Sequence, residues 1–443
     1  MATIAIFIIG AEILLLYCFV VMNRLAINNS KFNFKQIMKI KNTHIWIVFI
    51  LFSLMFSCKS KMPIKIAVPV VESTSTVLEI GANRTTAYVP LLMQKRIAIV
   101  ANQTSVIFKS NQTAIHLVDS LTNLQLDIKK VFAPEHGFRG DADAGELIKD
   151  GFDVKTGIPI ISLYGNNKKP TAEQLTGIDL VIFDIQDVGV RFYTYISTLH
   201  YVMEACAENN IPLLVLDRPN PNAHFIDGPV LEMKHQSFVG MHPIPVVYGM
   251  TIGEYGLMIN GEKWLHNQIQ CDLTIVPLAN YNYQTFYSLP IKPSPNLPND
   301  QAVNLYPSLC FFEGTNVSVG RGTEQQFQIY GSPFLPKNQY SYNFTPQPNL
   351  GAKSPLHQGK ICFGEDLKNH PKLAELNLEW LQKAYQLTEN NTLFFNDFFK
   401  KLAGTDQLQQ QIEQGMALDE IKKSWEYDLK SFKKIRKKYL LYD

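Results

Sequence analysis

Four short apolar runs, rich in valine and isoleucine, place the strongest limits on what this chain can fold into. They occupy residues 96–101, 129–133, 179–184 and 213–217, and polar or turn-forming residues bound each of them. Runs of this length are typical of strands buried on both faces, as in a parallel sheet. Between the last two runs, residues 196–210 carry apolar side chains three or four positions apart, which predicts one helical face. Repeated strand–helix–strand units predict an α/β fold with a Rossmann-like, doubly wound parallel sheet.

The chain is long enough for more than one domain, since 443 residues exceed the ~100–200 residues of a single domain. We expect an upstream segment with a signal peptide at residues 1–57 and a tether at residues 58–88. The Rossmann-like catalytic domain is predicted at residues 89–236. From about residue 236 the frequency of Pro, Asn, Tyr and Phe rises, so a smaller α+β domain that completes a cleft is expected at residues 237–443.

The amino-terminal residues indicate an export signal. A short basic segment at residues 38–41 precedes an apolar run at residues 45–57, and Cys58 follows directly. This order is typical of bacterial lipoprotein signals, and the run is shorter than the ~20 residues of a spanning helix. We therefore expect lipidation at Cys58 and a protein anchored to a bacterial membrane, in the periplasm or at the cell surface. Met38 is then the expected start, the alternative being a membrane helix at residues 3–22.

Composition and motif searches exclude several classes of function. A net charge of +2 without a long basic run argues against nucleic-acid binding, and no C-x-x-C pair suggests zinc. No Gly-rich phosphate loop follows any predicted strand, which disfavours a nucleotide cofactor despite the Rossmann-like pattern. The chain also lacks the G-x-S-x-G and H-E-x-x-H motifs of common hydrolases. We expect neither a cofactor nor a metal.

Charged and polar residues gather where the predicted strands end. One cluster begins at Glu135, a second follows the strand at 179–184, and a third begins at Asp217. Ligands of open α/β sheets bind beyond the carboxyl ends of the strands. The three clusters are therefore expected to converge on one pocket that is rich in acids and arginines.

The acids in these clusters suit cleavage of a glycosidic bond, which needs a proton donor and a second group that activates water or stabilises positive charge. Glu135 lies between Pro134 and Phe138, and desolvation by such neighbours favours the neutral, proton-donating form. Asp187 is the predicted second carboxylate. His136 is expected either to orient a carboxylate or to bind a sugar hydroxyl.

The arginines point to an anionic substrate, because guanidinium groups bind carboxylates bidentately. A lattice of salt bridges is the alternative explanation for several of them. Aromatic residues such as Tyr193 offer a surface on which a sugar ring can stack. The predicted substrate-binding residues are Arg139, Glu146, Gln186, Arg191, Tyr193, Asp217, Arg218, Asn220 and Arg321.

A series of short motifs, taken in order, resembles the NamZ-type exo-β-N-acetylmuramidases, formerly the domain of unknown function DUF1343. The motifs are APEHGFRG (133–140), TGIP (156–159), SLYG (162–165), FDIQDVG (183–189), LDRPNP (216–221), GMTIGE (249–254), PSPN (293–296), EGTN (313–316) and GRGT (320–323). The resemblance runs from about residue 90 to the carboxyl end. The chain departs from the family at residues 324–328, which read EQQFQ, and at Tyr248, where a histidine is common.

The resemblance implies that single N-acetylmuramic acid units are released from the non-reducing ends of peptidoglycan glycan chains, in cell-wall recycling or scavenging. The lactyl carboxylate of that sugar would give the arginines a role. Glu135 and Asp187 lie inside matched motifs and are carried over as the acid/base and its partner, with His136 beside them. The alternative is a surface lipoprotein that binds cell-wall glycan without cutting it, because charged rims suit binding as well as hydrolysis.

Overall fold

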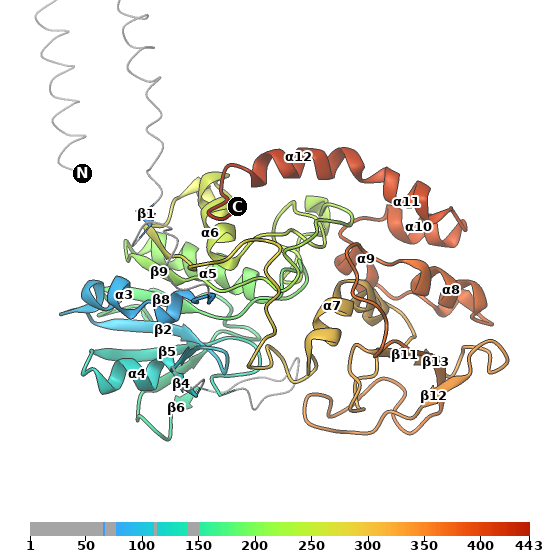
Figure 1. Ribbon diagram of the computed structural model, residues 1–443, viewed down its shortest axis with the longest axis horizontal. Helices are drawn as coiled ribbons and strands as arrows, with labels where there is room; N and C mark the ends of the chain where they lie inside the picture. Colours follow the sequence, from blue (N-terminus) through green and yellow to red (C-terminus); the bar gives the residue numbers. More distant parts are fainter. Residues whose placement is uncertain (1–64, 67–76, 110–112, 140–149) are drawn as a thin grey trace, which may run out of the picture. The chain divides into compact units, whose positions relative to one another are not determined.

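The computed structural model describes residues 65–66, 77–109, 113–139 and 150–443 (Figure 1). The predicted signal peptide and Cys58 lie outside these residues. The described part belongs to one compact unit, Ile64–Asp443. None of its helices combines the length and the apolar character needed to cross a membrane.

An eight-stranded sheet forms the core of the first half of this unit. The strands, in spatial order, are β1 (Lys65–Ile66), β10 (Leu273–Val276), β9 (Leu213–Leu216), β8 (Leu180–Asp184), β2 (Ile97–Ala101), β5 (Ile128–Ala133), β7 (Pro159–Ser162) and β6 (Gly151–Phe152). Only β6 pairs antiparallel with its neighbour, and the other pairs are parallel. Strands β2, β5, β8 and β9 coincide with the four predicted apolar runs, which confirms the α/β class.

Helices cover both faces of the sheet, as a doubly wound fold requires. Alternate residues of β2 enter different apolar clusters: Ala98 and Val100 pack with α5 (Tyr195–Glu208) and α6 (Ile252–Gly261). Ile97 and Ile99 pack on the opposite face with α3 (Thr85–Leu92) and α4 (Leu117–Asn123). Burying each such Val, Ile or Leu side chain contributes ~1.5–3 kcal/mol, so the two-sided burial explains why these runs are continuously apolar.

The predicted boundary at residue 236 is wrong, because the sheet continues beyond it. Helix α6 and strand β10 both follow residue 236 and belong to the sheet layer. Thr251 begins α6 with a capping box, in which its hydroxyl accepts from the Glu254 amide and the Glu254 carboxylate accepts from the Thr251 amide. The rise in Pro, Asn and Tyr after residue 236 therefore marks long connecting segments of the first domain.

The second domain follows the sheet and is the expected smaller α+β unit. It begins with α7 (Asp300–Leu309) and the 3-10 helix η4 (Cys310–Gly314). Its antiparallel sheet has the order β11 (Ile329–Ser332), β13 (Cys362–Asp366) and β12 (Tyr342–Phe344). The later helices are α8 (Glu379–Leu387), η5 (Asn391–Leu393), α9 (Phe398–Ala403), α10 (Gln407–Glu413), α11 (Leu418–Ser424) and α12 (Glu426–Arg436). The remaining short elements of the first domain are η1 (Gly81–Asn83), β3 (Val106–Phe108), β4 (Ala114–His116), η2 (Met233–His235) and η3 (His266–Gln268).

The predicted tether at 58–88 is too long, because its last ten residues are part of the fold. Glu79 bridges to Ala279, and Tyr88 of α3 is fully buried. The Gly81 amide donates to the Asp217 carbonyl at 2.9 Å. A Cβ at residue 81 would lie 2.5 Å from the Asp217 nitrogen, so only glycine permits this approach.

The segment after α12 returns to the first domain, where the chain ends beside α6 (Figure 1). Its residues complete a buried polar network. The Tyr442 hydroxyl donates to Asp217 Oδ2 at 2.6 Å and accepts from the Leu278 amide at 2.9 Å. The Leu441 amide donates to Glu254 Oε1 at 2.7 Å. Asp217 is fully buried, so the hydrogen bond from Tyr442 offsets part of the cost of removing water from its carboxylate.

Replacing Tyr442 with phenylalanine should destabilise the protein by ~1–3 kcal/mol, because a buried acceptor loses its donor. Urea unfolding of Tyr442→Phe measures this loss. Tyr427, which is 79% exposed, provides the matched control. Equal stability of Tyr442→Phe and Tyr427→Phe would show that the hydrogen bond to Asp217 contributes nothing.

Candidate active site

A cavity of about 420 Å3 lies between the carboxyl ends of the sheet strands and the second domain. The first domain lines it with residues that follow β5, β7 and β8, and the connecting segment adds residues 294–297. The second domain contributes side chains from α7, η4, α9 and the segment before β11. The volume falls within the ~300–1,000 Å3 of typical small-molecule sites. The cavity therefore has the size and the shared lining of a substrate site that two domains complete.

Glu135 faces this cavity from the turn after β5. Its carboxylate accepts a hydrogen bond from Thr194 Oγ1 at 2.8 Å, and Thr194 directly precedes α5. Tyr164, which follows β7, also interacts with Glu135; burial and then this carboxylate raise the pKa of Tyr164 well above its usual value. Hydroxyl groups from the segments that follow β7 and β8 thus orient the Glu135 carboxylate.

His136 is held in place by the shape of its turn. Its φ of 70° and the φ of 79° at Gly137 are both left-handed, a conformation that histidine tolerates better than most residues. The ring is buried and lines the cavity, with Nε2 3.2 Å from Ser294 Oγ. The predicted pair Glu135 and His136 therefore reaches the cavity together.

Aromatic rings form much of the wall. The Tyr193 hydroxyl donates to the Pro293 carbonyl at 2.8 Å, and Tyr195 donates to the same oxygen at 3.3 Å. Burial raises the pKa of Tyr193 well above its ordinary value, so this phenol stays neutral. Phe192 packs edge-on against Tyr306 of α7, with ring centroids 5.5 Å apart. The wall offers flat apolar surface with few polar points, which suits one face of a sugar ring.

The second domain brings a charged pair into the lining. Arg321 Nη1 lies 2.9 Å from Glu313 Oε1, and about a quarter of each side chain is exposed. Arg321 Nη2 donates to the Gly351 carbonyl at 3.3 Å, and the Asn296 side chain donates to the same oxygen at 2.7 Å. Of the predicted arginines, Arg321 is the one that the structure brings to the cavity.

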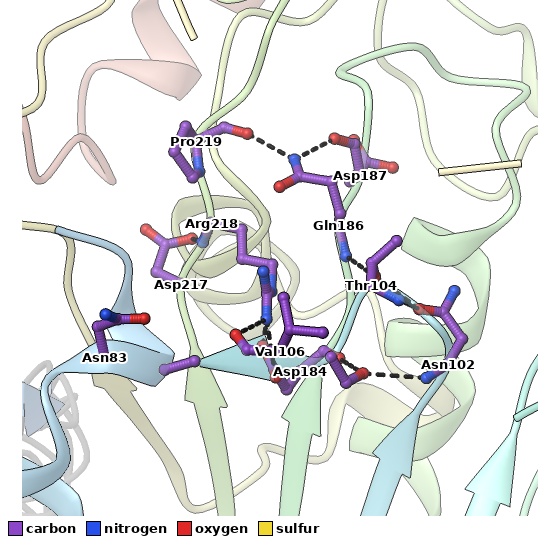
Figure 2. A network of polar contacts seen from close by, with 12 residues as sticks. Asn83, Asn102, Thr104, Val106, Asp184, Gln186, Asp187, Asp217, Arg218 and Pro219 are labelled. Atoms are coloured by element: carbon purple, nitrogen blue, oxygen red, sulfur yellow. Dashed lines mark hydrogen bonds and ion pairs between the residues drawn. The ribbon is translucent and has the colours of Figure 1, made fainter. Parts of the chain in front are cut away.

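Three of the other predicted binding residues, Gln186, Asp217 and Arg218, belong to a buried network beyond β8 and β9, shown in Figure 2. The guanidinium of Arg218 binds Asp184 through two hydrogen bonds of 2.6 and 2.9 Å. The Gln186 side chain donates to the Pro219 carbonyl at 2.7 Å. Asp217 accepts from four donors and has no exposed surface. None of these side chains lines the cavity, so the geometry assigns them to holding the strand ends together.

Asp187 and Asn220 also lie behind the cavity wall. The Tyr248 hydroxyl and the Gly189 amide both donate to Asp187 Oδ2, the latter at 2.6 Å. The Asn220 side chain packs on Gly189, where a Cβ would lie 2.1 Å from Asn220 Oδ1. The predicted convergence of three clusters on one pocket is thus wrong in part. Glu135 of the first cluster lines the cavity, whereas the first polar residues of the second and third clusters make buried contacts behind its wall.

Arg191 ties the two domains together. Its fully buried guanidinium donates to the carbonyls of Pro229 and Ile244 at 2.7 and 2.8 Å. The other nitrogen donates to Leu402 and Ala403 at the end of α9, at 2.9 and 2.7 Å. A cation at a helix carboxyl end also interacts favourably with the helix dipole. Every one of these acceptors is a backbone oxygen, which leaves Arg191 no route to a substrate.

Arg139 belongs to a salt-bridge lattice, the alternative that the sequence left open. Its guanidinium binds Asp153 at 2.8 Å and Asp119 at 3.1 Å, and Lys155 joins Asp119 at 2.6 Å. Arg139 is not among the residues that line the cavity. Glu146, a further predicted binding residue, lies outside the described residues.

Comparison with known proteins identifies the family. The models of the N-terminal and C-terminal domains of exo-β-N-acetylmuramidase NamZ match residues 97–301 and 304–442. Peptidoglycan β-N-acetylmuramidase NamZ of Bacillus subtilis is 39% identical over 375 residues, which cover 80% of this chain and 89% of that protein. The chain belongs to the NamZ family. The two family models also meet between residues 301 and 304, where α7 begins, and this agrees with a sheet domain that extends past residue 236.

Two solved structures share the fold. Both are DUF1343 family proteins of Bacteroides fragilis. One is 46% identical with a TM-score of 0.75, covering 83% of this chain and 99% of that one. The other is 26% identical with a TM-score of 0.70, covering 83% and 100%. The NamZ assignment thus rests on sequence and on architecture.

Several lining residues that sequence reasoning did not single out lie inside NamZ motifs. Tyr164 belongs to SLYG, Asn296 to PSPN and Glu313 to EGTN. Thr194 directly follows the predicted aromatic residue Tyr193. The sequence motifs contain these lining residues, but a motif alone does not show which of its residues faces the cavity.

The pH dependence of stability should report the burial of Asp187. Burial raises the pKa of this carboxyl to about 6, whereas an aspartate in an unfolded chain titrates near ~4. Between about pH 4 and pH 6 the folded protein binds a proton that the unfolded chain releases, so this group's stabilising contribution falls as pH rises through that window. Asp187→Asn should flatten this part of the profile, measured by urea unfolding at about pH 4.5 and pH 7.

Asp179 provides the control of opposite sign. Hydrogen bonds from Arg96 hold the pKa of Asp179 below its usual range, so its contribution is present at neutral pH and is lost on acidification. Asp179→Asn should therefore remove stability mainly at the higher pH. An unchanged profile in Asp187→Asn would contradict the assignment of Asp187 to a buried, proton-retaining site.

Proposed function

We propose that the cavity is the active site at which this NamZ family member, an exo-β-N-acetylmuramidase, releases N-acetylmuramic acid from the non-reducing ends of peptidoglycan glycan chains. The observation that carries the proposal is the position of Glu135, a motif carboxylate held by Thr194 and Tyr164 at the wall of the cavity. The Bacillus subtilis relative is itself a peptidoglycan β-N-acetylmuramidase, which favours catalysis over the alternative of a glycan-binding lipoprotein.

Glu135 is the proposed proton donor. When the glycosidic bond breaks, its electron pair stays on the leaving oxygen, and a proton from Glu135 neutralises that oxygen. Thr194 and Tyr164 fix the direction in which the carboxyl group points. The water that completes hydrolysis supplies the proton that restores the acid form of Glu135, so the enzyme returns to its starting state.

His136 and the aromatic wall are proposed to orient the sugar. The His136 ring and Ser294 Oγ lie together beside Glu135, where they present polar atoms to ring hydroxyls. Tyr193 and Phe192 form the flat apolar surface on the lining. Holding a single sugar unit in a fixed pose brings its bond to Glu135 within reach, which is a large part of the catalytic effect.

Arg321 is proposed to bind the lactyl carboxylate that distinguishes N-acetylmuramic acid from N-acetylglucosamine. Among the described residues it is the arginine that lines the cavity, where it already pairs with the carboxylate of Glu313. A guanidinium is the side chain best matched to a carboxylate.

Glu135→Gln should lower kcat about 10²–10⁴-fold, the usual size of an acid/base contribution. The assay measures free N-acetylmuramic acid released from a disaccharide that carries it at the non-reducing end. Glu173, an exposed glutamate before β8, gives the control variant Glu173→Gln, which should turn over normally. Normal turnover in Glu135→Gln would remove this residue from the mechanism.

Arg321→Lys should raise KM about tenfold or more, because a point charge replaces a bidentate fork worth ~1.5–3 kcal/mol. The control is Arg96→Lys, which changes an exposed ion pair with Asp179 in the same way. Steady-state kinetics with the same disaccharide separate KM from kcat. A KM equal to that of Arg96→Lys would show that another group recognises the lactyl carboxylate.

We further propose that the protein is exported and anchored to a membrane through a lipid on Cys58. The order of basic segment, apolar run and cysteine at residues 38–58 supports this. A substrate in the cell wall also requires an enzyme outside the cytoplasm. The mature chain would then begin at Cys58, with the folded unit on the far side of a short tether.

A further inference from the structure

Glycoside hydrolysis needs a second group at the anomeric carbon, and the structure places Asp187 behind the cavity wall. We propose that Glu313, from the second domain, is the second catalytic carboxylate and faces the anomeric carbon opposite Glu135. This inference rests on the proposed function and adds to it a residue that the sequence did not single out.

The lining of the cavity carries the proposal. Among the described residues that line it, two have carboxylate side chains, Glu135 and Glu313. They come from different domains, one from the turn after β5 and the other from η4. A sugar in this cavity would therefore meet a carboxylate from each domain, and paired carboxylates on either side of the scissile bond are what glycosidases use.

Each of the two acids is held by a contact within its own domain. Glu135 accepts from the hydroxyl of Thr194, a neutral donor. Glu313 forms an ion pair with Arg321 at 2.9 Å, an interaction of the ionised carboxylate.

The backbone around Glu313 is rigid enough to hold a reacting group. The two preceding residues, Phe311 and Phe312, are fully buried. The next residue, Gly314, packs so closely on α9 that a Cβ would lie 2.4 Å from Phe399 Cα. The Asn316 amide then donates to the Phe394 carbonyl at 2.9 Å. Preorganised groups of this kind cost no rearrangement when charge develops.

The reaction balances with these two acids. The bond between C1 and the glycosidic oxygen breaks, its electrons stay on the oxygen, and Glu135 supplies the proton. Glu313 stabilises the positive charge at C1 from the α face of the β-linked sugar. Water then forms the new bond to C1 in one of two ways. It attacks directly, gives its proton to Glu313, and solvent passes that proton on to Glu135; or it breaks the ester bond that Glu313 has formed with C1 and gives its proton to Glu135. Arg321 can bind Glu313 and the lactyl carboxylate at once, which would set their relative positions.

The test uses Glu313→Ala and Glu313→Gln with 4-nitrophenyl β-N-acetylmuramide, whose leaving group needs little protonation. Both variants should lose about 10²–10⁴-fold in kcat. Azide should restore turnover of Glu313→Ala by attacking C1 from the α face, so the product is the α-glycosyl azide. Glu375→Ala, which removes an ion pair with Lys422 in the same domain, is the matched control and should keep its activity.

Three outcomes would overturn the proposal. In the first, kcat stays within tenfold of wild type in Glu313→Gln. In the second, the loss appears in KM alone and equals that of Arg321→Lys, which would make Glu313 a support for the arginine. In the third, Asp187→Asn, and not Glu313→Ala, yields the α-azide. Thermal melting of Glu313→Gln shows that the variant is folded.

The wild-type protein separates this inference from the proposed function. A wild type that releases no sugar would refute the function itself. A wild type that is active, with an inactive Glu135→Gln and an active Glu313→Gln, would refute only the role of Glu313.

Discussion

The need to partner buried charge at the carboxyl ends of β8 and β9 governs this structure. A carboxylate or guanidinium without water is costly unless donors or acceptors surround it. Asp184 is matched by Arg218, and Asp217 gathers Thr251, Gly253 and Tyr442. Meeting these requirements brings α6 and the segment after α12 to one point of the sheet. Arg191 does the same between the domains, because its acceptors lie on both. The cavity lies outside this network, because none of these buried polar groups lines it.

This constraint also explains why the strand ends have two functions. The residues directly after β8 and β9 are covered by neighbouring segments and serve as mutual partners. Residues that reach the cavity either follow a strand closely, as Glu135 does after the interior strand β5, or stand farther along a loop, as Tyr193 and Thr194 do. Support and chemistry are thus arranged in two layers, with the supporting layer closer to the sheet. Mutations in the inner layer are expected to act on stability first, and those in the outer layer on turnover.

The apolar runs were sufficient to predict the sheet, because residues such as Ile99 and Val100 must be buried on opposite faces. Glu135 and His136 were predictable from their place after β5. The roles of Asp187, Arg191 and Arg218 were not, since an isolated charge near a strand end looks the same whether it meets substrate or another side chain. Glu313 was missed for the complementary reason: only the packing of η4 against the first domain reveals that it shares a cavity with Glu135. The domain boundary failed because loop composition resembles that of a new domain.

The hydrogen bond between Tyr442 and Asp217 joins positions 225 residues apart. During synthesis, Asp217 therefore emerges from the ribosome long before Tyr442, one of the four donors that offset the cost of burying this carboxylate. Until then the amino-terminal half can bury its apolar side chains, but the hydrogen-bond network around Asp217 is incomplete. This point of the sheet should therefore gain its full set of hydrogen bonds only when nearly all of the chain has been made. Residues near Asp217 are thus synthesised early but acquire their last buried hydrogen bond late.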